Sequence, residues 1–158
     1  MKNLLNYISA ALFLSLMVFA SCGGGDDGEG DNPLDVIASN LTGTATFDSY
    51  TPAPGSTSTL DFSSLEVTFN GDAEGGRYTT TGSPDLTVWP AAGDWEFANN
   101  SGTRITRSSD VNGVDDVLVT VEFNNDITQV TFSFEVDTNG GSSAPGTIDG
   151  PWVFVMGK

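Results

Sequence analysis

Apolar and polar side chains alternate along much of the chain after residue 34, most clearly in two neighbouring segments, residues 115–124 and 127–137. A period of two is typical of a β-strand that buries one face. The predicted inward set is Val117, Val119, Val121 and Phe123 in the first segment and Val130, Phe132, Phe134 and Val136 in the second. Glu122, Gln129, Ser133 and Glu135 are predicted to face outward.

The same pattern continues through the domain, where Gly, Asn and Asp cluster about every 8–12 residues, as in β-sandwiches and barrels. It predicts eight strands, at residues 41–50, 60–70, 77–81, 93–98, 103–108, 115–124, 127–137 and 152–156. Helix signals are almost absent, and only residues 33–38 favour a turn or two of helix.

Residues 34–158 therefore form a single all-β domain. The short connections favour antiparallel neighbours, because parallel strands need a longer crossover. We expect an eight-stranded up-and-down barrel, which removes sheet edges and is wide enough for packed side chains or one small ligand. A β-sandwich is the alternative.

The first 21 residues have the pattern of a secretory signal. Lys2 precedes an apolar run at residues 4–20, which is 17 residues long and thus marginal for a membrane span of about 20 residues. The run ends in Phe19-Ala20-Ser21-Cys22, which resembles the lipobox of bacterial lipoproteins. The resemblance implies cleavage before Cys22, whose acylation, for example with palmitate, would anchor the chain to a membrane. The alternatives are an ordinary signal peptide or a transmembrane anchor.

Residues 22–33 combine this cysteine with a glycine-rich, acidic stretch, GGGDDGEGDNP, which lacks the apolar residues needed for folding. We expect a flexible tether. Gly23, rather than an aspartate, fits the familiar sorting rule for outer-membrane lipoproteins, and the cluster of glycine and acids resembles a surface-export signal. The expected location is the outer membrane, at the cell surface. A plain linker on a periplasm-facing protein is the alternative.

The amino-acid composition excludes several kinds of catalytic and metal site. The chain has no histidine, one cysteine and a formal net charge of −16. These counts leave no imidazole base or histidine metal ligand and no intrachain disulfide, and they disfavour nucleic-acid binding. Paired carboxylates remain, but Asp94 and Glu96 alternate with Trp95 and Phe97, so we expect the acids to face solvent. We expect no enzyme and no cofactor.

A calcium site is a further candidate. Asp110, Asn112, Asp115 and Asp116 supply oxygen ligands within one short stretch, although the spacing is not that of an EF-hand loop. A hairpin turn rich in Asx residues and glycine is the simpler interpretation.

Aromatic side chains are the remaining binding candidates. Tyr78, Trp89 and Trp95 are the proposed ligand-binding residues, either at a barrel mouth or stacked on a sugar. Trp95, like Trp152, also fits a core position. Arg104 and Arg107 are three residues apart and cannot share a strand face. We expect the arginines to pair with the surplus acids.

Four short segments resemble lipocalin-like barrels, including small lipoproteins of gram-negative bacteria. They are Leu41–Phe47 (LTGTATF), Trp89–Phe97 (WPAAGDWEF), Thr103–Arg107 (TRITR) and Gly150–Phe154 (GPWVF). Ala45 stands where lipocalins carry a first-strand tryptophan. The resemblance implies a barrel fold.

Together these features lead to two hypotheses. The first is a membrane-anchored lipoprotein that binds a small apolar ligand or is structural. The alternative is a glycan-binding β-sandwich module of a surface nutrient-uptake system, using exposed tryptophan.

Overall fold

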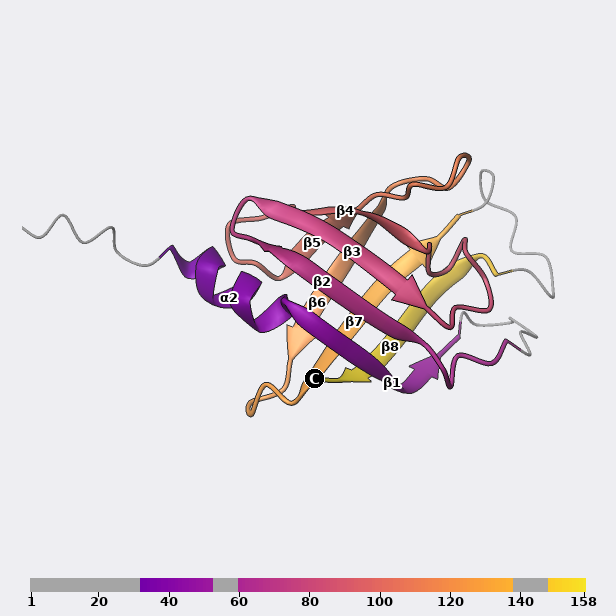
Figure 1. The fold of residues 1–158 in the computed structure, drawn as a ribbon, viewed down its shortest axis with the longest axis horizontal. Coiled ribbons are helices and arrows are strands. Elements are labelled where there is room, and N and C mark those ends of the chain that lie inside the picture. Colours follow the sequence, from indigo (N-terminus) through magenta and orange to yellow (C-terminus); the bar gives the residue numbers. More distant parts are fainter. Residues whose placement is uncertain (1–31, 53–59, 138–147) are drawn as a thin grey trace, which may run out of the picture. The chain divides into compact units, whose positions relative to one another are not determined.

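The computed structural model describes residues 32–52, 60–137 and 148–158. Eight antiparallel strands pair in chain order and form a closed barrel, because β8 pairs with β1 (Figure 1). The strands are β1 (Gly43–Thr51), β2 (Glu66–Asp72), β3 (Gly75–Thr81), β4 (Ala92–Phe97), β5 (Arg104–Arg107), β6 (Val117–Phe123), β7 (Gln129–Val136) and β8 (Gly150–Gly157). The predicted up-and-down barrel is confirmed, and it is compatible with a lipocalin-like fold. The sandwich alternative is wrong, because closure leaves no separate pair of sheets.

The predicted alternation in β6 and β7 is also confirmed. Val119 and Val121 are buried on β6, while Val117 and Phe123 at its ends are partly buried and pack against the core. All four predicted inward residues of β7 are buried. Eight consecutive register pairs join β7 to β8, from Gln129–Gly157 to Val136–Gly150. A one-residue slip would turn the valine and phenylalanine side chains outward, so burial specifies this register.

The N-terminal helix is longer than the sequence pattern predicts. Helix α2 runs over Pro33–Leu41, with Asn32 as its N-cap and proline in its first turn. Leu41 was expected to open the first strand, but it is buried in the last turn of the helix. Both the backbone N–H and the hydroxyl of Thr42 donate to the Ala38 carbonyl and end the helix there.

The second strand begins later than expected, at Glu66 rather than at residue 60. Phe62 and Leu65 are nevertheless buried, since the stretch before β2 packs onto the core. The ring of Phe62 makes edge contacts with Trp152 and Phe154 of β8. The apolar residues before β2 therefore predicted correctly that this segment is buried. The prediction that its backbone is a strand was wrong.

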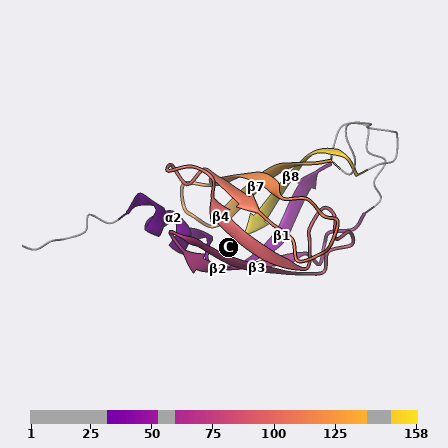
Figure 2. The same ribbon diagram turned by 90° about the horizontal axis from the view of Figure 1, so that it is seen from above.

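The two ends of the barrel differ. Both ribbon views place α2 at one end, which we call the helix end (Figures 1 and 2). There Ile37 contacts Gly102 in the β4–β5 turn, whose φ of +66° favours glycine. The Lys158 ammonium donates to the carbonyls of Leu41 and Thr42, each at 2.9 Å. The opposite end, called the loop end, carries the β3–β4 connection (residues 82–91) and the β5–β6 connection (residues 108–116).

Aromatic side chains fill the barrel interior between these ends. Six rings are in contact with one another and almost fully buried, namely Phe69, Trp89, Phe132, Phe134, Trp152 and Phe154. Large rings supply much of the apolar burial that stabilises so small a domain. Among the residues that the structure describes, no helix is both long enough and apolar enough to span a membrane.

Candidate functional site

The β3–β4 connection folds back into the loop end of the barrel. Its turn is held by Asp85, whose carboxylate accepts from the backbone N–H of Thr87 at 2.8 Å, while its carbonyl accepts from that of Trp89. Asx side chains commonly stabilise such turns. The turn directs Val88 and Trp89 inward, where both are fully buried. Trp89 then makes edge contacts with Phe132, Phe134 and Phe154, 5.4–5.6 Å between ring centroids.

Arg107 enters the same region from the end of β5. Its side chain is 1% exposed and its guanidinium carbon lies 4.6 Å from the Trp89 ring centroid and 4.7 Å from that of Phe134. One terminal nitrogen, Nη2, donates to the Val88 carbonyl at 3.1 Å. The guanidinium therefore lies among aromatic rings, in a cation–π environment.

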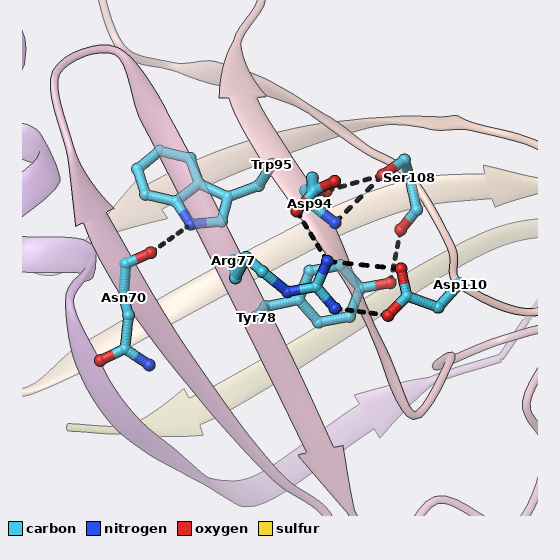
Figure 3. Close-up of polar contacts among 7 residues, drawn as sticks. All are labelled: Asn70, Arg77, Tyr78, Asp94, Trp95, Ser108 and Asp110. Carbon is cyan, nitrogen blue, oxygen red and sulfur yellow. Dashed lines mark hydrogen bonds and ion pairs between the residues drawn. The ribbon is translucent and has the colours of Figure 1, made fainter.

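Tyr78 of β3 forms the third side of this region. Its ring centroid is 6.0 Å from the Arg107 guanidinium carbon, and its hydroxyl donates to the Ser108 carbonyl at 2.6 Å (Figure 3). Burial raises the pKa of Tyr78 to about 12. Burial also lowers the pKa of Arg107 to about 10, and the guanidinium therefore stays charged at neutral pH.

Three buried side-chain atoms of the described residues have no hydrogen-bond partner: Thr80 Oγ1, Trp89 Nε1 and Arg107 Nη1. Thr80 lies two residues from Tyr78 on the inward face of β3. By contrast, the indole N–H of Trp95 donates to the Asn70 carbonyl (Figure 3) and that of Trp152 to the Ile148 carbonyl. Unpaired buried polar atoms are uncommon and destabilising, so their presence at one end requires an explanation. We call Arg107, Trp89 and their unpaired nitrogens the Arg107–Trp89 site.

On the outer face of the barrel, Arg77 pairs with acidic side chains, as expected for the arginines. Its guanidinium donates to Asp94 at 3.0 Å and forms an ion pair with Asp110 (Figure 3). These carboxylates, Asp110 foremost, raise the pKa of Arg77. All three side chains are more than half exposed, so this pairing contributes little stability. The expected pairing is thus found for Arg77.

The same expectation is wrong for Arg107, which points inward without a carboxylate. Arg104 is exposed, as expected for residues three apart on a strand. Buried Ile105 already fixes the inward parity of β5, and residue 107 shares it. That parity is the sequence signal that would have identified Arg107 as an interior residue.

The proposed calcium ligands are not brought together. Asp110 turns toward Arg77, Asn112 is exposed, and Asp115 and Asp116 line a pocket of about 210 Å³ at the loop end. Within residues 32–52, 60–137 and 148–158, no group of three or more acidic, histidine or cysteine side chains is placed to hold a metal ion. Calcium binding by this stretch stays a prediction to which the geometry adds no support.

The carboxylates of Asp94 and Glu96 face outward, opposite to Trp95, as expected. They line an open pocket of about 350 Å³ together with Glu74 and Asp116. Asp94 is bonded to Arg77.

The structure therefore brings two of the three aromatic candidates, Tyr78 and Trp89, into one interior region with Arg107. Trp95 is equally buried but lies toward the helix end, where it contacts Phe69 and Phe97. No tryptophan of the chain presents an exposed ring for stacking on a sugar: Trp89, Trp95 and Trp152 are at most 2% exposed. Cys22 lies outside the described residues.

Comparison with known proteins adds no name to this geometry. No known family, no curated protein and no solved structure matches the chain significantly.

Proposed function

We propose that this chain is a lipid-anchored, non-enzymatic outer-membrane protein whose barrel binds a compact polar ligand at the Arg107–Trp89 site. The anchoring part rests on the sequence alone, through the lipobox-like segment that ends at Cys22 and the tether that follows. The binding part rests on one observation, the two unpaired donor nitrogens inside the loop end.

Two features favour a compact polar ligand over a lipid-like one. Six contacting aromatic rings fill the interior, so a long apolar chain would have to displace packed side chains. The unpaired groups of the interior include two nitrogen donors, Nη1 of Arg107 and Nε1 of Trp89. An apolar ligand would leave both donors without a hydrogen bond. A ligand that carries an acceptor removes this cost.

Glycan binding, the alternative function, receives no such support. Sugar recognition by stacking needs an accessible ring face, and all three tryptophans are buried. We therefore develop only the interior site.

The anchor is tested by labelling cells that express the chain with radioactive palmitate. We expect label on the wild-type protein and none on Cys22→Ser. A protein that stays membrane-bound and unlabelled would contradict lipid anchoring and indicate a transmembrane segment instead.

The binding part is tested by NMR of the full chain in detergent micelles. The chain has three tryptophans, so its indole N–H groups give three signals, of which those of Trp95 and Trp152 are internally bonded references. The probes are oleate, an oligosaccharide, formamide and sodium chloride. A compact probe is expected to shift the Trp89 signal in a saturable way. If neither compact probe does so, the binding proposal fails and a structural role is favoured.

A further inference from the structure

The buried guanidinium of Arg107 carries a positive charge that no acidic side chain of the interior neutralises. Thr80 and Arg107 are the only polar or charged residues buried within the described part of the chain. Arg77 on the outer wall forms ion pairs with Asp94 and Asp110, and neither of these acids is buried. The two internal segments outside the described residues, 53–59 and 138–147, contain no Asp or Glu. Among the described residues, therefore, no buried carboxylate supplies a counter-charge for Arg107, and a bound anion would supply one.

The surrounding rings compensate this charge only in part. Trp89 and Phe134 make cation–π contacts with the guanidinium, which are modestly favourable. Burying an unpaired ion costs more than such contacts return. In addition, Nη1 of Arg107 and Nε1 of Trp89 are donors without acceptors. A partner for Arg107 therefore needs negative charge, and a partner for either nitrogen needs to accept a hydrogen bond.

We propose that the Arg107–Trp89 site binds a compact monovalent anion, such as a halide or nitrate ion, held by Nη1 of Arg107 and Nε1 of Trp89. This inference rests on the proposed function and names the chemical class of its ligand. One unpaired cationic side chain matches a single negative charge. The close packing around Trp89, which touches three phenylalanine rings, favours an ion of few atoms.

A pocket of about 210 Å³ lies at the loop end, beside the surroundings of this site. Three of its lining residues adjoin the Arg107 surroundings: Thr87 precedes Val88, Val117 pairs with Arg107 in the sheet, and Val136 follows Phe134 on the same strand face. Asp115, Asp116, Glu135 and Asp137 also line this pocket. Their repulsion is smallest for a monovalent ion, and added salt screens it.

The test uses the same three indole signals of the full chain in micelles, with chloride titrated against gluconate at constant sodium concentration. Formamide serves as a neutral acceptor of similar size. We expect chloride to shift the Trp89 signal in a saturable way and to leave those of Trp95 and Trp152 in place. Formamide is expected to leave all three unchanged.

Arg107→Gln removes the charge and is expected to abolish the chloride response. Arg104→Gln, on the exposed face of the same strand, is the matched control and should keep the response. If Arg107→Gln does not fold, the line width of the ³⁵Cl NMR signal on the wild type gives an independent measure. Specific binding predicts broadening that added nitrate reverses, in wild type and in Arg104→Gln alike.

The outcomes separate the two levels of the proposal. A saturable response to formamide but not to chloride would overturn the anion and leave the proposed function standing. Responses to neither probe, with no reversible chloride broadening, would overturn both. A linear shift of all three signals with chloride, or a response that persists in Arg107→Gln, is a general salt effect and also overturns the anion site.

Discussion

Two buried tryptophans, Trp95 and Trp89, summarise the difference between the two ends of the barrel. Trp95 points toward the helix end and donates its indole N–H to the Asn70 carbonyl at 3.2 Å. Trp89 at the loop end is equally buried, yet its indole nitrogen has no partner. The three unpaired buried atoms of the described residues all belong to the loop-end half. The unpaired hydrogen-bonding groups of the described interior thus lie toward the loop end.

The largest expected effect is on the free energy of unfolding, when one leucine at each end of the barrel is replaced by alanine. Leu41→Ala empties a site that is 1% exposed under the helix end and should lower the free energy of unfolding by about 2–5 kcal/mol. Leu86→Ala makes the same chemical change at the loop end, where the side chain is 45% exposed, and should change it by at most about 0.5 kcal/mol. Urea denaturation measures both. A loss of at most about 0.5 kcal/mol for Leu41→Ala as well would show that α2 does not help to hold the core.

The second comparison uses pH to examine the loop end through Tyr78. Its pKa is about 12 in the folded protein against an ordinary value of 10.0, so its contribution is complete below pH 10 and is lost as pH rises through about 12. At neutral pH, Tyr78→Phe should cost about 0.5–1.5 kcal/mol through the lost bond to Ser108.

Between pH 10 and 12 the stability advantage of wild type over Tyr78→Phe should fall by about 2 kcal/mol, and by about 2.7 kcal/mol once the pH is well above 12. The effect of Arg107 ionisation is common to both proteins and largely cancels in the difference. Urea denaturation at each pH, with tyrosinate absorbance followed on the folded protein, measures this. An advantage that stays constant with pH would contradict the burial of Tyr78 beside Arg107.

The smallest of the three effects compares the tryptophans directly, in chloride-free gluconate buffer. Trp95→Phe and Trp89→Phe remove the same atoms, but only the first removes a hydrogen bond and leaves the Asn70 carbonyl without it. Trp89→Phe instead removes an unpaired donor. We expect Trp95→Phe to be less stable than Trp89→Phe by about 1–3 kcal/mol. Equal stability would indicate that water already pairs with the Trp89 nitrogen.

Much of the fold could be predicted because β-strands with one buried face reveal themselves by alternation. The alternation in β7 predicted both the strand and its buried face, which carries Val130, Phe132, Phe134 and Val136. Leu41 misled the prediction, since an apolar residue before an alternating run fits either the end of a helix or the start of a strand. Only the bonds from Thr42 to the Ala38 carbonyl decide between the two.

The candidate site could be predicted only in part. Tyr78 and Trp89 were identified as aromatic candidates, but Trp89 lies in a turn, where alternation gives no facing direction. Arg107 was assigned to the surface pairs because charged residues are rarely buried without a partner. Its inward parity with Ile105 was visible, yet a general expectation about charge outweighed it. Exceptions to such general rules are expected mainly at functional or strained positions.

The bonds of Lys158 to the carbonyls of Leu41 and Thr42 also have a mechanical consequence. Under the proposed anchoring, tension on the chain before residue 32 would enter the folded domain through α2, whose last turn is hydrogen-bonded to Lys158, the residue that follows β8. The load is then shared between β1, which follows α2 along the chain, and β8, which pairs with β1. The Lys158 side chain thus links the end of α2 to the end of β8 and opposes separation of the first strand from the barrel.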